Sequence, residues 1–199
     1  TEAGKALSGK YNKQYFTILS GYVDRIPEED ILCTIRTMEK GDPERIFERE
    51  LEQGHHTTVE RFFTRLRDQA EGKAVALVAE YRGQLAGYNN VYSAPPCAGP
   101  FEGKGYGAII DFGVFATYRR HGIGGRLMDV AEKVAAEIAD TVFLSVGLHS
   151  GYGSAQRMYV KRGYLPDGSG AWYRDRNLEP YAGCLNDDDL VLHLAKRLR

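Results

Sequence analysis

The chain has 199 residues, a length at which one domain can bury a substantial core. Hydrophobic residues make up 43% and charged residues 27% of it, proportions that exclude a disordered or collagen-like chain. Lysine and arginine total 26 against 27 aspartates and glutamates, a formal net charge of -1, so no overall basic field would recruit nucleic acid or anionic lipid.

Membrane segments and disulfides are both disfavoured. No apolar run approaches the ~18 residues that a spanning helix needs. The three cysteines, Cys33, Cys97 and Cys184, are widely spaced, odd in number and without a C-x-x-C pair, which argues against a disulfide framework and a thiolate zinc site. We expect no signal peptide, because no continuous apolar segment follows the first lysines. A cytoplasmic location fits these features best.

Hydrophobic periodicity predicts the order β-α-α-β-β-β-α-β-α-β-β after an extension of unclear role, residues 1–30, which holds one candidate strand at 14–19. Ten of these eleven elements have expected bounds, the strand before the last being the exception: a strand 31–38, a helix to about 51, a helix to about 71, a hairpin of strands 74–81 and 84–92, a strand 106–115, a helix to 138, a strand 141–146, a helix 154–162 and a last strand 190–194.

Local signals predict the boundaries between these elements. Gly41-Asp42-Pro43 supplies an N-cap aspartate with proline at the first helical position, and Thr57 or Thr58 can cap the next helix. The stretches 93–107 and 163–170 are rich in glycine and proline, and we expect both to be loops.

A glycine-rich turn, residues 114–125, joins the strand 106–115 to the helix that follows. The unpaired N–H groups and the macrodipole of a helix start attract anions, and glycine lets a ligand approach closely. Arg119, Arg120 and Arg126 could add charge-assisted hydrogen bonds. The alternative is that these glycines serve tight packing alone.

Two spaced motifs resemble those of the GNAT superfamily of N-acetyltransferases. Residues 119–124, Arg-Arg-His-Gly-Ile-Gly, are similar to its Q/R-x-x-G-x-G/A signature, although Ala116 stands where the family usually has proline. Residues 152–164 are similar to its N-x-x-A-x-x-x-Y-x-x-x-G-F pattern, with Ala155, Tyr159 and Gly163 in place and Tyr152 instead of asparagine. The resemblance covers roughly residues 31–198.

The resemblance implies an α/β (α+β) fold: a mixed, mostly antiparallel central sheet flanked by helices, with splayed fourth and fifth strands. It makes residues 31–199 an acetyl-CoA-dependent N-acetyltransferase domain that transfers acetyl directly to a primary amine in a ternary complex. Main-chain N–H groups of the turn would hold the pyrophosphate, and the fourth strand would pair with pantetheine. The implied cofactor-binding residues are Phe112, Gly113, Val114, Phe115, Arg119, Arg120, Gly122, Ile123, Gly124, Gly125, Arg126 and Ala155.

The resemblance also implies catalytic roles. Tyr159 occupies the general-acid position, from which a tyrosine hydroxyl can protonate the leaving thiolate, although by itself it would be read as a core aromatic. The N–H of Val114 is the candidate oxyanion donor. The base that deprotonates the amine is left open between Asp111 and His149, either of which could instead be an exposed polar residue, with Glu80 and Glu102 as weaker candidates.

The acceptor is open: a small-molecule or peptide amine, such as a polyamine, an aminoglycoside, an amino acid or an N-terminal amine. Two aromatic-rich groups could form its pocket. These are Trp172, Tyr173, Arg174 and Tyr181, and Tyr88, Asn89, Asn90 and Tyr92.

The five histidines have no metal-ligand spacing, so we expect no metal and mostly solvated rings. No nucleic-acid or membrane partner is expected, and a homodimer stays open. The alternatives are a non-catalytic CoA-binding or regulatory module of the same fold, and a phosphate-binding regulator that uses the glycine turn alone.

Overall fold

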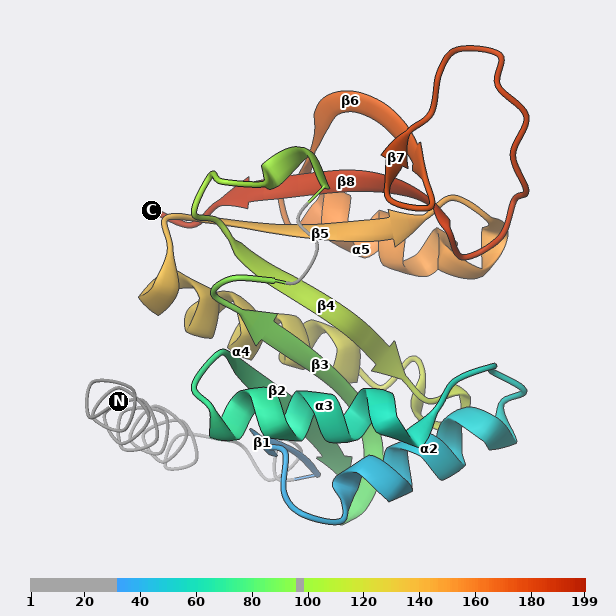
Figure 1. The fold of residues 1–199 in the computed structure, drawn as a ribbon. Helices are drawn as coiled ribbons and strands as arrows, with labels where there is room; N and C mark the ends of the chain where they lie inside the picture. The colour runs from blue at the N-terminus through green and yellow to red at the C-terminus, as the bar shows by residue number, and fades with distance from the viewer. Residues whose placement is uncertain (1–31, 96–98) are drawn as a thin grey trace. The chain divides into compact units, whose positions relative to one another are not determined.

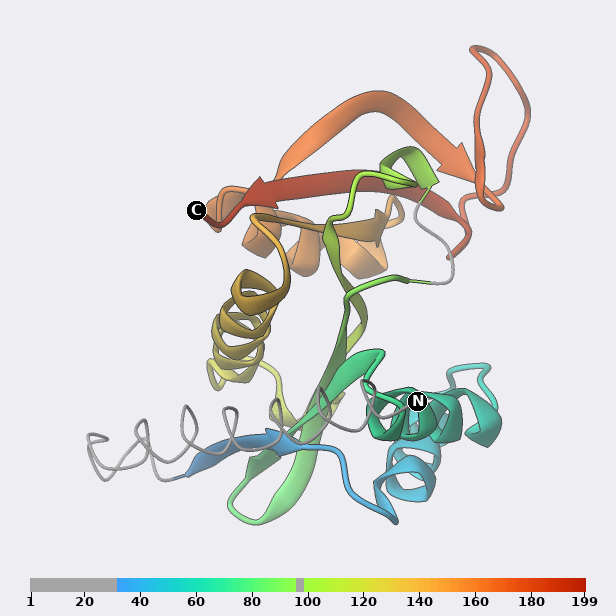
Figure 2. The same ribbon diagram turned by 60° about the vertical axis from the view of Figure 1, so that its left-hand side comes forward.

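The computed structural model describes residues 32–95 and 99–199 and divides them into two compact units (Figures 1 and 2). Among these described residues, unit 1 comprises those from 32 to Val91 together with Asp111–Val134, and unit 2 comprises those from Tyr92 to Ile110 with Ala135–Arg199. Strand β4 (Gly107–Val114) and helix α4 (Ile123–Ile138) contribute residues to both. The candidate strand 14–19 and the extension 1–30 lie outside the described residues.

Unit 1 is a layer of strands between helices. Its elements are β1 (Cys33–Thr37), α2 (Asp42–Glu52), α3 (Val59–Ala70), β2 (Ala74–Tyr81), β3 (Gln84–Tyr92), the 3-10 turn η3 (Ala116–Tyr118), and the parts of β4 and α4 given above. The strand order is β1-β2-β3-β4, with β1 and β2 antiparallel. Figures 1 and 2 show α2 and α3 on one face of these strands and α4 on the other.

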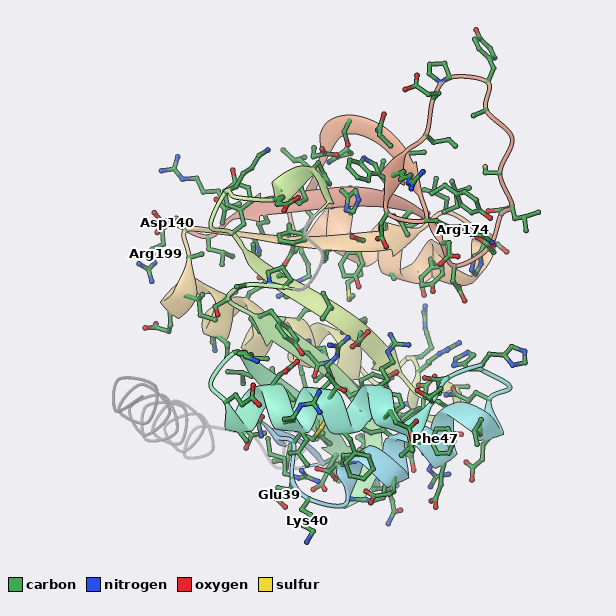
Figure 3. All side chains as sticks on the ribbon, in the orientation of Figure 1. Glu39, Lys40, Phe47, Asp140, Arg174 and Arg199 are labelled. Atoms are coloured by element: carbon green, nitrogen blue, oxygen red, sulfur yellow. The ribbon has the colours of Figure 1, made fainter. Side chains whose placement is uncertain are left out.

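The core on the α2 and α3 side of unit 1 is assembled from apolar faces at helical and strand spacing. Phe62 of α3 meets Tyr88 of β3 edge to face at 5.5 Å, and Tyr88 in turn lies 6.0 Å from Phe115, measured between ring centroids. Phe47, labelled on α2 in Figure 3, packs against the same cluster. The buried members are Met38, Ile46, Phe62, Ala76, Val78, Leu85, Tyr88 and Phe115.

Unit 2 contains β5 (Thr141–Gly147), α5 (Gly153–Lys161), β6 (Leu165–Tyr173), β7 (Arg176–Asn177) and β8 (Leu190–Arg197), with 3-10 turns η2 (Gly99–Phe101) and η4 (Ser150–Tyr152). The strand order is β4-β5-β8-β6-β7. β4 and β5 are parallel, with Gly107 opposite Val142 and Ala108 opposite Phe143, whereas β8 is antiparallel to β5 and β6. The expected mixed, mostly antiparallel sheet flanked by helices is confirmed.

An ion pair in unit 2 links the C-terminal residue to the segment that precedes β5. The guanidinium of Arg199 lies 3.7 Å from a carboxylate oxygen of Asp140, and both residues are labelled in Figure 3. β8 continues to Arg197, three residues beyond the expected end at residue 194. Within residues 32–95 and 99–199, no helix is both long and apolar enough to cross a membrane.

The expected loop at 163–170 is wrong, because β6 begins at Leu165. Gly168 and Gly170 have φ values of 91° and 83°, and the pairing of β6 with β8 shifts register between Pro166 and Ala171. The glycines therefore serve a bulge inside a strand rather than a connection between strands. Trp172, one of the aromatic residues considered for the acceptor pocket, lies in this strand.

The expected capping role of Asp42 is also wrong. Gly41 is the N-cap of α2 and Asp42 is its first residue. The Asp42 carboxylate instead accepts hydrogen bonds from the guanidinium of Arg36, at 2.5 and 3.0 Å, and from the amide of Glu39 at 2.8 Å. Thr58 is the N-cap of α3 as expected, without a side-chain capping bond.

Candidate active site

The glycine turn of unit 1 has the backbone geometry of an anion site. Arg120 and Gly122 both have left-handed conformations, with φ values of 68° and 75°. The amide of Arg126 donates to the carbonyl of Gly122 at 3.2 Å and so opens the hydrogen-bond ladder of α4. The amides of Ile123 and Gly124 precede that bond, at the positive end of the helix dipole. These groups fit a phosphate-bearing ligand.

Side chains around the turn hold its shape. His121 donates through Nδ1 to the carbonyl of Arg119 at 2.9 Å, and its ring lies 5.1 Å from that of Tyr81 on β2. Arg119 Nε donates to the carbonyl of Val114 at 3.1 Å. Arg119 thus braces the end of β4 in addition to bringing positive charge to the turn.

Gly125 is a glycine that neither packing nor backbone conformation requires. A Cβ built on it would meet nothing within 4 Å, and its φ is not left-handed. At Gly87, by contrast, a Cβ would lie 2.6 Å from the carbonyl oxygen of Gly113, so packing alone excludes a side chain there. The open space beside Gly125 is consistent with a ligand that approaches the first turn of α4.

Asp111 lies on β4 with a φ of 53°, a conformation that is rare for a residue other than glycine. One of its carboxylate oxygens accepts from Arg61, and the other accepts from Arg65 Nε at 2.6 Å. Asn90 Nδ2 lies 3.4 Å from the second oxygen of Asp111. The Asp111 side chain is 8% exposed. Both oxygens are thus engaged by arginines of α3.

A second polar cluster of unit 1 joins α2 to β3. Glu50 is 7% exposed, and its two carboxylate oxygens accept from the Tyr88 hydroxyl at 3.1 Å and from His55 Nδ1 at 2.5 Å. Burial, with the neighbouring Glu50 charge, raises the pKa of Tyr88 well above its usual value. Tyr88 therefore stays protonated and donates to Glu50.

The second motif of the sequence forms α5 of unit 2. Tyr159 is 4% exposed, and burial raises its pKa, with a smaller contribution from Tyr152. Gln156 Nε2 donates to the carbonyl of Gly147 at 2.7 Å and ties α5 to β5. Ala155 lies in the first turn of the same helix.

Tyr152, which replaces the usual asparagine of that motif, is fixed by its surroundings. Its ring lies where a side chain on Gly147 would be, 2.3 Å from the built Cβ, and its hydroxyl donates to Asp188 at 2.8 Å. His149 uses both ring nitrogens: Nδ1 accepts from the amide of Gly151 at 3.1 Å, so Nε2 donates to Asp188 at 3.0 Å. In this arrangement His149 has no lone pair for a substrate.

His193 is the exception to the expectation of mostly solvated histidines. Its side chain is buried on β8 beside Trp172, with ring centroids 5.0 Å apart, and Nδ1 lies 2.8 Å from Ser145 Oγ. Burial lowers its pKa. Among residues 32–95 and 99–199 no group of three or more metal-ligating side chains occurs.

The structure thus places the expected site residues in two sets. Unit 1 contains Asp111, the cofactor-binding residues of β4 and the glycine turn, whereas unit 2 contains Ala155 and Tyr159. Sequence reasoning did not identify Glu50, His55, Arg61 or Arg65 as members of polar clusters. The one local signal for the first pair was the order Gly54-His55 at a helix end, a pattern typical of a C-cap.

Comparison with solved structures finds the same fold. Ard1 from Thermoplasma volcanium is 19% identical, with a TM-score of 0.61 over 83% of this chain and 97% of the other. The yncA protein of Salmonella typhimurium, solved with acetyl-CoA, is 15% identical, with a TM-score of 0.62 over 84% of this chain and 95% of the other. Arabidopsis thaliana Naa50, in complex with the bisubstrate analogue CoA-Ac-MVNAL, is 15% identical, with a TM-score of 0.58 over 83% of this chain and 98% of the other.

Comparison with curated proteins found no match. The family model described as "Acetyltransferase (GNAT) family" matches residues 37–164, a stretch that contains both the glycine turn and the Tyr159 motif. This chain therefore belongs to the GNAT family of acetyltransferases.

Proposed function

We propose that the protein transfers the acetyl group of acetyl-CoA to a primary amine, and that residues 31–199 carry this activity. The observation that supports it most is the presence of both motifs within the matched stretch 37–164. The structure of yncA, which has the same fold, includes acetyl-CoA. When bound, acetyl-CoA supplies an activated thioester; the steps that follow belong to residues of this chain.

The glycine turn binds the pyrophosphate in this proposal. The main-chain N–H groups of Arg120 and residues 122–125 point toward the anion, with Arg119 and Arg126 adding charge. The edge of β4, Phe112–Phe115, pairs with pantetheine, and the N–H of Val114 donates to the oxygen that gains negative charge.

Tyr159 donates the proton that the leaving sulfur requires. Because burial raises its pKa, the hydroxyl is protonated at neutral pH, which is the state a proton donor needs. Asp111 remains a candidate base from the sequence, although its oxygens already accept from two arginines.

The acceptor is a small-molecule or peptide amine. The bisubstrate analogue bound to Naa50 joins CoA to a peptide, which makes a peptide with a free N-terminal amine the first class to test. Polyamines, aminoglycosides and amino acids complete the panel.

The test is calorimetric titration of the protein with acetyl-CoA, with and without ATP, followed by thiol release with each amine of the panel. We expect acetyl-CoA to bind, ATP not to displace it, and at least one amine to release thiol. Binding without release would favour the non-catalytic CoA-binding module, and displacement by ATP would favour a nucleotide-binding regulator. No binding of acetyl-CoA would overturn the proposal.

A further inference from the structure

Helix α2 ends in a turn that brings His55 back to Glu50. The amide of His55 donates to the carbonyl of Glu50 at 3.0 Å, and the amide of Gly54 donates to the carbonyl of Leu51 at 2.9 Å. Gly54 has a φ of 77°, so the chain closes the helix with the left-handed glycine of a Schellman motif. The backbone bond between residues 50 and 55 holds their side chains side by side.

The contact between the two side chains fixes the tautomer of His55. A carboxylate only accepts hydrogen bonds, so the 2.5 Å contact between Nδ1 and Glu50 places the proton on Nδ1. The other oxygen of Glu50 is held by the Tyr88 hydroxyl. The Nε2 lone pair of His55 is left, on a side chain that is 52% exposed, with no hydrogen-bond partner among residues 32–95 and 99–199.

This arrangement has the logic of a histidine base oriented by a buried carboxylate. The carboxylate selects the tautomer, directs the ring and stabilises the imidazolium that forms when Nε2 takes a proton. Tyr88 of β3 and Arg61 of α3 both interact electrostatically with Glu50, and both also interact with Asp111 of β4.

The His55–Glu50 pair is anchored to the strand that is proposed to bind the thioester. The ring of Tyr88 lies against Gly113, whose built Cβ would be 3.0 Å from it. Gln53, in the same turn as Gly54, accepts from the amide of Ala116 at 2.6 Å. The end of α2 is thus linked to the chain around Val114 in two ways within unit 1: directly through Gln53 to Ala116, and indirectly through the Glu50–Tyr88 hydrogen bond to the neighbour of Gly113.

The earlier candidates for the base are already engaged. The oxygens of Asp111 accept from Arg61 and Arg65, and both ring nitrogens of His149 are hydrogen bonded. Among these three residues, His55 is the one with a ring nitrogen or carboxylate oxygen that has no hydrogen-bond partner in residues 32–95 and 99–199.

We propose that His55 is the general base that deprotonates the acceptor amine, with Glu50 and Tyr88 as positioning residues; this inference rests on the proposed function. Nε2 takes a proton from the amine as the amine nitrogen forms its bond to the acetyl carbon. The C–S bond breaks, its electron pair stays on sulfur, and the sulfur is protonated by the acid proposed above. His55 then gives its proton to water, and the acid regains one from water, so that both groups return to their starting states.

The test compares His55→Gln with His56→Gln, because the neighbouring histidine is also exposed but makes no contact with Glu50 in the described structure. Each variant is assayed for acetyl-CoA binding by calorimetry and for thiol release with the amine panel, including peptides with a free N terminus. We expect His55→Gln to lower kcat by about 10²–10⁴-fold with the acetyl-CoA Kd unchanged, and His56→Gln to match the wild type.

Chemical rescue separates a base from a structural residue. Imidazole added to His55→Ala should restore part of the lost thiol release, and it should give no such gain with His56→Ala. A His55→Gln variant with wild-type kcat, or a His55→Ala variant that imidazole does not rescue, overturns the proposal.

A measurement without acceptor keeps the two proposals distinguishable. Nitrogen-15 spectra of the imidazole rings report the tautomer, and we expect the Nδ1–H form for His55 in the wild type and its loss in Glu50→Gln. If the wild type binds no acetyl-CoA or releases no thiol, the proposed function fails. The spectra then still show whether Glu50 sets the tautomer of His55. The Nε2–H form in the wild type overturns the inference.

Discussion

Replacement of Gly125 by alanine should change stability and ligand binding in opposite directions. The added methyl group meets no atom within 4 Å, and the backbone there is not left-handed. Alanine at a compatible helical position is more stable than glycine by about 0.5–1 kcal/mol. At about 2–4 °C per kcal/mol for a chain of this size, the melting temperature should rise by about 1–4 °C.

The same methyl group would occupy the space beside the first turn of α4 that we assign to the pyrophosphate. We expect the acetyl-CoA Kd to rise at least tenfold, a loss of about 1.4 kcal/mol. Calorimetry and thermal unfolding of one preparation measure both effects, and Gly183→Ala, in an exposed loop with nothing within 4 Å, is the matched control. Unchanged acetyl-CoA affinity in a stabilised Gly125→Ala would refute the placement of the anion at this turn.

Three further predictions concern stability. Gly87→Ala should destabilise by about 1–3 kcal/mol in thermal unfolding, because its Cβ would lie 2.6 Å from a backbone oxygen; a neutral effect would show that β3 and β4 can separate there. Burial alone would raise the pKa of Asp42, but the hydrogen bonds from Arg36 and the Glu39 amide lower it overall. Asp42→Asn should therefore cost about 1.5–3 kcal/mol in urea unfolding at neutral pH, and the difference from wild type should shrink as the pH falls below about 4; a constant difference would count against the ion pair. Burial lowers the pKa of His193 in the folded state, so the buried neutral imidazole stabilises the fold above about pH 6.5, and this stabilisation is lost as the pH falls through the pKa of the folded state. Between these pH values the free energy of unfolding of His193→Gln should therefore fall less than that of the wild type. Free energies of unfolding that fall in parallel with pH in the two proteins would contradict this reasoning.

The elements that sequence reasoning located correctly are those whose signals are local. The spacing of apolar residues from Leu127 to Ile138 is complete within one helix, and α4 is found at Ile123–Ile138. The hairpin turn at Arg82-Gly83 likewise requires only neighbours in sequence, and β2 and β3 end and begin as expected.

The errors arise where composition has two structural meanings. Glycines at 168 and 170 are compatible with a loop and with a bulged strand, and pairing with β8 decides between them. Asp42 before a proline is typical of an N-cap, but Arg36 on β1 binds its carboxylate. Both outcomes depend on partners that the local pattern does not contain.

The polar clusters of the site could not be predicted from the sequence, because their partners are also far apart in the chain. Asp111 meets Arg61 and Arg65 across separations of 50 and 46 residues, and Tyr88 meets Glu50 across 38. No spacing rule links such positions within one sequence. The glycine turn and the Tyr159 motif were found because each is contiguous in the chain.

The most direct test of the proposed chemistry is the kcat for thiol release from acetyl-CoA, measured for wild type, Tyr159→Phe and Tyr164→Phe with the amine that the panel identifies. Tyr164 is a matched control because its ring is buried 5.8 Å from that of Tyr159 and phenylalanine is usual at its position in the motif. The account predicts a fall of about 10²–10⁴-fold for Tyr159→Phe with unchanged acetyl-CoA affinity, and wild-type turnover for Tyr164→Phe. Equal turnover by Tyr159→Phe and wild type would contradict it.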